Sequence, residues 1–205
     1  MRYFFACMCA PLAWAVLVSA SISALAAPDE WSTCTACHGA NAEGNRALKA
    51  PALAGQRPWY LVRQLENFAT GVRGAHPEDT TARQMRPFAE ALDGPQRERL
   101  ANYLSALEPV SRKGSRQGNL MNGSRYYHAR CGSCHGGKGE GNEAFQAPRL
   151  QGLSDQYLTR QMRYFQEGIR GNHEADKYGR QMGLMANTVS DAELHDILYF
   201  LAEQH

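Results

Sequence analysis

The sequence predicts an all-α protein built from two tandem copies of one small helical unit. Three observations predict this fold. Roughly a third of the residues at 34–107 are identical to the residue 97 positions later, apolar residues recur at helical spacing, and no segment shows sustained strand alternation. The 205 residues are 43% hydrophobic and 20% charged, which is typical of a globular chain. The formal net charge of +2 is too balanced to indicate a nucleic-acid partner.

The first 26 residues predict a secretory signal peptide. Arg2 precedes an uncharged apolar stretch, and Ala24-Leu25-Ala26 supplies the small residues of a cleavage site. Cleavage there would make Ala27 the first residue of an exported mature chain. An uncleaved anchor is the alternative, but the apolar run is shorter than the ~20 residues that a membrane span needs.

The repeat that follows has no gap. Cys34-Thr35-Ala36-Cys37-His38-Gly39 recurs as Cys131-Gly132-Ser133-Cys134-His135-Gly136. Further identical pairs are Glu43-Gly44-Asn45 with Glu140-Gly141-Asn142, Pro51 with Pro148, Arg63-Gln64 with Arg160-Gln161, and Arg83-Gln84-Met85 with Arg180-Gln181-Met182. We expect one unit at 27–108 and the other at 119–205, joined by a polar linker at 109–118. Units this small have a marginal core unless something else stabilises them.

The helices of each unit can be taken in order. Pro58 opens an amphipathic helix, and its counterpart follows the N-cap Ser154. Each unit closes with a helix, at 95–107 and at 190–203, and Ser190-Asp191-Ala192-Glu193 forms a capping box.

The repeated CxxCH motif is the attachment signature of a c-type haem. On one helical turn both thiols can form thioether bonds, and the adjacent histidine can bind the iron. The motifs therefore predict two covalently bound haem c groups, attached through Cys34 and Cys37 and through Cys131 and Cys134, with His38 and His135 as iron ligands. A zinc site, a redox dithiol and structural disulfides are the alternatives.

The second axial ligand decides whether a haem iron is closed to substrates. Met85 and Met182 occupy the same repeat position, 47 residues after His38 and His135 respectively, and His/Met ligation raises the reduction potential. We predict both methionines as ligands. His76 and His173 also form a repeat pair and are the rival ligands, although a hydrogen bond within their Gly-Arg-Gly loops would equally explain them.

The same offset also indicates residues that would support the iron ligands. A ligating imidazole usually donates its second N–H to a carbonyl, and Pro51 and Pro148 are placed to offer one. Four repeated arginines either meet haem propionates or are solvated surface charges: Arg63, Arg73, Arg160 and Arg170. Each unit should also pack against the other through polar groups that both copies share.

These motifs resemble the dihaem cytochrome c4 family, whose members contain two tandem class I cytochrome c domains. The resemblance covers nearly the whole chain after the signal peptide. It implies two small helical folds, each around one covalent haem, with thioethers at the four cysteines, iron ligands at His38, Met85, His135 and Met182, and orienting carbonyls at Pro51 and Pro148. It also implies a periplasmic electron carrier, free or loosely membrane-associated, that passes electrons towards terminal oxidases. Members of the family open each domain with an N-terminal helix, which the second unit keeps at 119–130. The first unit has only residues 28–33 before Cys34, so we expect its haem crevice to be more exposed or covered by a partner.

Three functions compete on this evidence. The first is a non-enzymatic shuttle between a membrane or periplasmic donor and a terminal oxidase or other acceptor. The second is the cytochrome subunit of a periplasmic dehydrogenase, of the flavocytochrome c sulfide dehydrogenase type. The third, an enzyme such as a dihaem peroxidase or a thiosulfate dehydrogenase, needs an open or differently ligated haem. Both copies offer the same methionine and no cysteine is spare, so we predict no catalytic residue.

Overall fold

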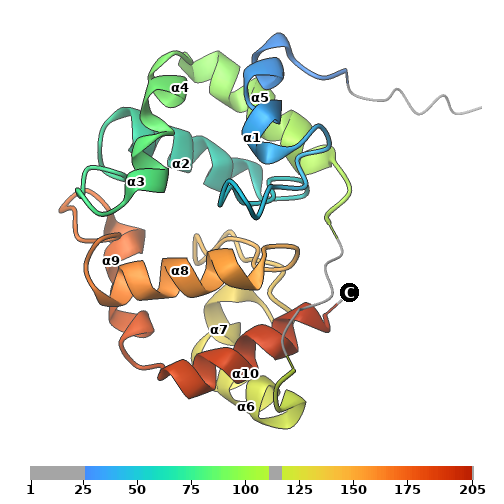
Figure 1. The fold of residues 1–205 in the computed structure, drawn as a ribbon, viewed down its shortest axis with the longest axis vertical. Helices are drawn as coiled ribbons and strands as arrows, with labels where there is room; N and C mark the ends of the chain where they lie inside the picture. Colours follow the sequence, from blue (N-terminus) through green and yellow to red (C-terminus); the bar gives the residue numbers. More distant parts are fainter. Residues whose placement is uncertain (1–25, 111–116, 205) are drawn as a thin grey trace, which may run out of the picture.

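The computed structural model describes residues 26–110 and 117–204. Over these residues every regular element is a helix, and the only strand-like pairings are two isolated bridges, Asn45 with Ala50 and Asn142 with Ala147. Figure 1 shows two helical bodies, one from each half of the chain, stacked along the long axis. The predicted all-α fold of two tandem units is confirmed. We call the described residues up to 110 domain 1 and those from 117 domain 2.

Two parts of the sequence prediction lie outside this range. The predicted signal peptide at 1–26 is described only at Ala26, and the middle of the predicted linker at 109–118 is likewise outside. Within the described ranges, no helix is both long enough and apolar enough to span a membrane.

Domain 1 packs its helices around a core that reaches back to the N-terminal turn. Its elements are η1 (Asp29–Thr33), α1 (Thr35–His38), α2 (Pro58–Ala69), α3 (Thr80–Arg83), α4 (Arg86–Glu90) and α5 (Gly94–Ala106). α2 packs on α4 and on α5. Trp31, Leu61, Leu100 and Leu104 are buried together between them.

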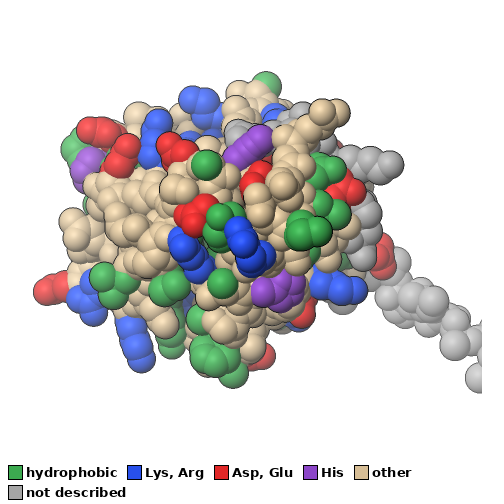
Figure 2. Space-filling model, turned by 90° about the horizontal axis from the view of Figure 1, so that it is seen from below, with side chains coloured by type: hydrophobic (Ala, Val, Ile, Leu, Met, Phe, Trp, Pro, Cys, Tyr) green, Lys and Arg blue, Asp and Glu red, His purple; other side chains and the backbone are tan. Residues whose placement is uncertain are grey.

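Domain 2 repeats this arrangement with a full helix at its start. Its elements are α6 (Leu120–Arg130), α7 (Gly132–His135), α8 (Asp155–Gln166), α9 (Lys177–Ala186) and α10 (Asp191–Ala202). α6 crosses α10, and Tyr127, Ile197 and Leu201 lie in the shared core. Seen from this end (Figure 2), basic, acidic and hydrophobic side chains are interspersed without a dominant charge.

Side-chain caps fix where the predicted helices begin. Ser154 accepts from the Tyr157 amide (3.2 Å), as expected for the N-cap of α8. Both halves of the predicted capping box are present, since Ser190 Oγ accepts from the Glu193 amide and the Glu193 carboxylate accepts from the Ser190 amide. These predicted starts are therefore confirmed to within a residue.

The missing N-terminal helix of domain 1 is replaced by one buried aromatic residue. Trp31 of η1 is 4% exposed, stacks near Tyr103 with ring centroids 6.2 Å apart, and donates from Nε1 to Ala40 O (3.3 Å). In domain 2, Tyr127 of α6 lies 5.3 Å from Phe200 and donates to Gly136 O (2.6 Å). Trp31 thus fills the position that Tyr127 fills, and this side of domain 1 is closed by the chain itself.

The segments that carry the two predicted methionine ligands differ. In domain 2 the segment is the continuous helix α9, whereas in domain 1 it is divided into α3 and α4, with Met85 between them as the N-cap of α4. Pro87 explains the break because it has no amide hydrogen to donate to the preceding turn. Its repeat counterpart is Leu184, which can donate.

Candidate functional site

Each CxxCH motif folds as one turn of helix. Cys34 and Cys131 are the N-caps of α1 and α7, and the amides of His38 and His135 donate back to their carbonyls (both 2.9 Å). None of these four cysteines is paired in a disulfide. Burial raises the pKa of the Cys131 thiol to about 11.

The two motif histidines are oriented as the sequence predicted. The Nδ1 atoms of His38 and His135 each lie 2.9 Å from a proline carbonyl oxygen, that of Pro51 and that of Pro148 respectively. Both rings are buried, and burial lowers the pKa of each imidazole. A neutral imidazole that donates from Nδ1 keeps Nε2 as its ligating nitrogen. The predicted orienting hydrogen bonds are therefore confirmed.

The repeated Glu-Gly-Asn segment brings the proline to the histidine. The amides of Gly44 and Gly141 donate to His38 O (2.7 Å) and His135 O (2.8 Å). Both glycines have positive φ, +79° and +81°, and the chain then returns through the bridges at Asn45 and Asn142. This tight return explains why the segment is identical in the two copies.

We expect Gly141→Ala to destabilise domain 2. A methyl group there would lie 2.6 Å from the Arg149 backbone nitrogen, and φ of +81° is unfavourable for an L residue. Thermal unfolding of the haem-loaded chain should show a loss of about 1–3 kcal/mol in unfolding free energy. Gly94→Ala is the control because nothing lies within 4 Å of an added methyl group there. Equal stability of the two variants would contradict this account of the loop.

In domain 2 the predicted ligands face one mostly apolar cavity of about 170 Å³. Cys131, Cys134 and His135 line one side from α7, and Met182 reaches it from α9. Leu158, Met162, Ile197 and Leu201 contribute to the apolar wall. One cavity with mostly apolar walls is thus lined by two thiols, an imidazole and a thioether. These are the donor groups and the surroundings that a c-type haem requires.

The corresponding residues of domain 1 are arranged by the same elements. His38 is buried on α1, and Met85 packs beside Phe68, Ala82 and Ala89 between α2 and α4. Met185, which the sequence assigned to packing, lines the domain 2 cavity but is 38% exposed. The assignment of Met85 and Met182 as iron ligands stays a prediction.

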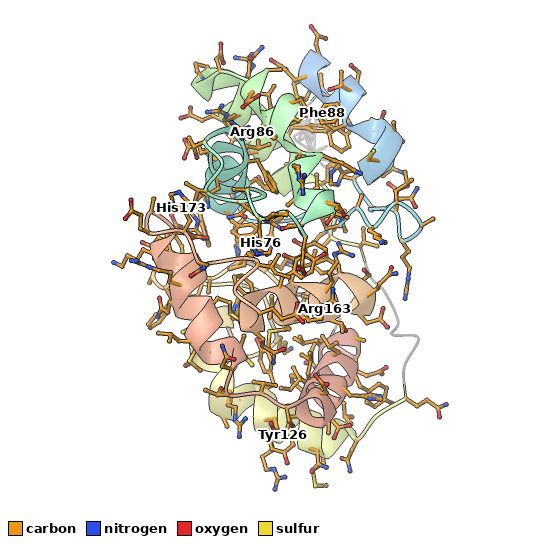
Figure 3. The ribbon with its side chains drawn as sticks, turned by 60° about the vertical axis from the view of Figure 1, so that its left-hand side comes forward. His76, Arg86, Phe88, Tyr126, Arg163 and His173 are labelled. Carbon is orange, nitrogen blue, oxygen red and sulfur yellow. The ribbon has the colours of Figure 1, made fainter. Side chains whose placement is uncertain are left out.

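The rival ligands His76 and His173 have a loop role. Their Nδ1 atoms accept from amides two residues further on, those of Glu78 (3.3 Å) and Ala175 (3.1 Å). Figure 3 shows both histidines in loops beside the seam between the domains. A hydrogen bond that stabilises the loop accounts for their recurrence in both copies.

The alternative uses of the cysteines find no support in the described residues. No group of three or more His, Cys, Asp or Glu side chains there is close enough to hold a metal ion. The cysteines of each pair are also not joined as disulfides.

A buried polar cluster joins the two domains. Its members come from the same three repeat positions in each domain: Tyr60, Gln64 and Arg73, and Tyr157, Gln161 and Arg170. We call these six residues the interdomain cluster. The prediction that repeated polar groups form the domain contact is confirmed.

The hydrogen bonds of the interdomain cluster are reciprocal. Arg73 donates to Gln64 Oε1 in its own domain (2.6 Å) and to Gln161 Oε1 across the seam (3.1 Å). Arg170 donates to Gln161 Oε1 (2.5 Å) and across the seam to Gln64 Oε1 (3.1 Å). Such reciprocity is typical of a two-fold symmetric interface. Arg73 is 8% exposed, so the alternative that it is a solvated surface charge is wrong.

The arginines also perturb a buried phenol. Arg73 Nη2 lies 3.3 Å from Tyr157 Oη, and Arg170 Nη2 lies 3.1 Å from Tyr60 Oη. Burial opposes ionisation of Tyr157, but the charges of Arg73 and Arg170 outweigh it and hold the pKa of Tyr157 below its ordinary value.

Domain 1 contributes to the wall of the domain 2 cavity. Tyr60, Arg63 and Gln64 line it together with Arg170 and Tyr157. Arg63 donates to Gln146 Oε1 (2.7 Å) and to Gln146 O (2.9 Å) across the seam, and its guanidinium lies 4.6 Å from the Tyr178 ring centroid. The domain 2 site is therefore complete only when the two domains are docked.

The family model described as Cytochrome c matches this chain twice, over residues 29–108 and 120–204. Cytochrome c4 of Azotobacter vinelandii is 31% identical over 169 residues, which are 76% of this chain and 78% of that protein. The thiosulfate dehydrogenase electron acceptor of Thiomonas intermedia (strain K12) is 32% identical over 210 residues, 95% of this chain and 84% of that protein.

Solved structures resemble the fold as well. The structure of cytochrome c4 from Acidithiobacillus ferrooxidans superposes with a TM-score of 0.66 at 26% identity, covering 83% of this chain and 98% of that one. The agreement extends over both domains.

Proposed function

We propose that this chain, which belongs to the cytochrome c family, works in the periplasm between a respiratory donor and a terminal acceptor such as an oxidase. It is a cytochrome c4-like electron carrier with two tandem domains and two covalently bound haem c groups. The observation that carries the proposal is the domain 2 cavity, where the CxxCH thiols and imidazole face Met182. The repeat supplies the same residue types in domain 1.

We assign the site residues by this geometry. Cys34 and Cys37, and Cys131 and Cys134, attach the two haems; His38 and Met85, and His135 and Met182, bind the irons. Each bound haem supplies an iron that takes up or releases one electron. The Pro51 and Pro148 carbonyls hold the histidine rings, and the thioethers of Met85 and Met182 would supply the second protein ligand to each iron. An iron held by two protein ligands would have no position for a substrate, so we infer that the chain carries electrons and performs no catalysis itself.

Export and domain limits belong to the same proposal. Residues 1–26 have the sequence of a cleaved signal peptide, which agrees with covalent haem attachment outside the cytoplasm. We place the domains of the mature chain at 27–108 and 119–205, with the linker at 109–118.

A second candidate is the electron-accepting partner or subunit of a periplasmic dehydrogenase. The names of two relatives favour it, since each is a thiosulfate dehydrogenase electron acceptor. In this case a separate chain oxidises the substrate and this chain removes the electrons. Co-purification of the tagged chain from native periplasm separates the candidates, because a stable dehydrogenase subunit would be recovered in fixed stoichiometry and a shuttle would be recovered alone.

We predict two haems per chain and two one-electron redox steps. Intact mass should equal the chain from Ala27 plus two haems, because each CxxCH motif attaches one. A redox titration followed by absorbance should resolve two couples, and no peroxide or thiosulfate turnover should accompany them. A mass with one haem or none would overturn the function, as would substrate turnover by the purified chain.

A further inference from the structure

An open groove of about 690 Å³ runs along the seam between the domains, away from the cavity that holds Met182. Domain 1 lines it with Arg46, Ala47 and Lys49 from the loop before α2. Domain 2 lines it with one face of α8: Asp155, Gln156, Thr159, Arg160 and Arg163. Figure 1 shows this loop facing the start of α8, and Figure 3 labels Arg163 on α8. The groove therefore presents side chains of both domains together.

The groove is strongly basic. Four cationic side chains and one carboxylate leave it a formal charge of +3. Arg46 is bound to that carboxylate, Asp155 Oδ1, at 2.8 Å, and Arg160 donates to Lys49 O at 2.8 Å, so these two guanidinium groups are held in place. Lys49 and Arg163 are exposed at the rim. The Arg163 guanidinium makes a 3.5 Å contact with the exposed Glu167 and lies 5.4 Å from the centroid of the Tyr164 ring. Exposed pairs of that kind contribute little and leave the cation available.

The repeat provides an internal comparison, because the equivalents of Arg46, Lys49 and Arg163 on the other side of the seam are acidic or neutral. Arg46 and Arg163 correspond to Glu143 and Glu66, and Lys49 corresponds to Gln146. Only the cross-seam arginine is common to both sides, as Arg63 donates to Gln146 O just as Arg160 donates to Lys49 O. Two cations therefore join the domains on the groove side: Arg160, through Lys49 O, and Arg46, through its ion pair with Asp155. The side chains of Lys49 and Arg163 take no part in these two contacts.

We propose that this groove is the docking surface for an acidic redox partner protein that contacts both domains at once. The proposal rests on the electron-carrier function proposed above and adds the charge and location of the partner. A protein surface fits better than a small anion, because the free cations lie on the rim of an open groove instead of converging on one enclosed point. Rim charges of this kind accelerate association through long-range attraction and orient the encounter.

The test uses the haem-loaded chain and two acidic probes. The first is a reduced, acidic plant-type ferredoxin, whose potential of about −400 mV makes it an electron donor to the chain. Stopped-flow mixing gives the second-order rate constant of reduction. The second probe is hexaglutamate, added as a competitor. The test variant is Lys49→Glu combined with Arg163→Glu, since both side chains lie on the rim.

We expect the double variant to be reduced about tenfold more slowly than the parent at low ionic strength, where steering extends furthest. The difference should vanish in about 1 M salt, where the Debye length is about 3 Å. Hexaglutamate should slow the parent and leave the variant unaffected. The matched control, Arg125→Glu combined with Lys138→Glu, changes the net charge equally at exposed positions outside the groove and should stay within about twofold of the parent.

Several results would overturn the proposal. An equal effect of the control variant would show that only net charge matters. Competition by phosphate as effective as that by hexaglutamate would indicate a small-anion site. Salt-sensitive self-association of the parent, lost in the test variant when followed by sedimentation, would make a second copy of the chain the occupant. A redox titration of the same samples separates failure of this proposal from failure of the carrier function. If the carrier function is wrong, the parent itself will lack the two redox couples.

Discussion

Replacing Met182 with alanine is expected to lower the reduction potential of the domain 2 haem by an amount of the order of 0.1–0.3 V, within the ~0.8 V range that axial ligands span. Met182 lies on α9 and lines the same cavity as His135. A thioether favours the reduced iron, so its loss favours the oxidised state. The weak sulfur-to-iron absorption band of the oxidised protein should fall by about half, because one of two equivalent sites is lost.

Met185→Ala is the matched control for this change. It removes a methionine from the same helix and the same cavity wall, three residues further on, where the side chain is 38% exposed. We expect its absorption band and both potentials to match the parent. Met85→Ala should in turn affect the other couple. Unchanged spectra in both ligand variants would contradict the assignment and point to His76 and His173.

The repeat made the histidine environment predictable because the structure that forms it is local. His38 and Pro51, like His135 and Pro148, are 13 residues apart, and one tight return through Gly44 or Gly141 brings each pair together. The identical residues of this segment therefore indicated that the backbone folds in the same way in both copies. The helix starts at Ser154 and Ser190 were predictable for the same reason, since a capping side chain acts within three residues.

The structure around the methionines was harder to predict. α9 was not expected as a helix, because Gly179 and Gly183 within it lower its intrinsic propensity. In domain 1 the counterpart of α9 is divided into α3 and α4, and Pro87 explains the division. The repeat did not indicate it, because the residue equivalent to Pro87 in the second copy is Leu184. Trp31 takes the place of Tyr127 but lies one position away from it in the repeat alignment. Matching identical residues between the copies therefore could not show that Trp31 covers this side of the domain 1 core.

The roles of the arginines depend on contacts between distant segments. Arg73 and Tyr157 are 84 residues apart in sequence, and no periodicity reports which faces of two domains meet. The available signal was that tyrosine, glutamine and arginine recur together in both copies at positions that no ligand role explains. The basic groove could be found in the sequence in the opposite way, because it forms where the two copies differ in charge.

Arg73→Met is expected to weaken the docking of the two domains. The variant removes the donor to Gln64, Gln161 and Tyr157 from a buried site, and methionine fills the space without replacing any hydrogen bond. Because bonds from a charged donor to buried acceptors are strong, we expect a loss of about 2–4 kcal/mol in unfolding free energy. Denaturant unfolding measures that loss, and small-angle X-ray scattering should show a larger radius of gyration. Arg99→Met, which breaks an exposed ion pair to Glu30 within domain 1, should cost less than about 1 kcal/mol.

A titration of Tyr157 separates this role from general destabilisation. Arg73 holds the pKa of the Tyr157 phenol below its ordinary value, so removal of the cation should raise that pKa, and phenolate absorbance should develop at higher pH than in the parent. Arg170→Met should have a similar effect because the interdomain cluster is reciprocal. The two substitutions together should cost less than the sum of the single losses, because both arginines donate to the same two glutamine oxygens. Additive losses, or an unchanged Tyr157 titration in both variants, would show that the arginines act separately and that the interdomain cluster does not hold the domains together as one unit.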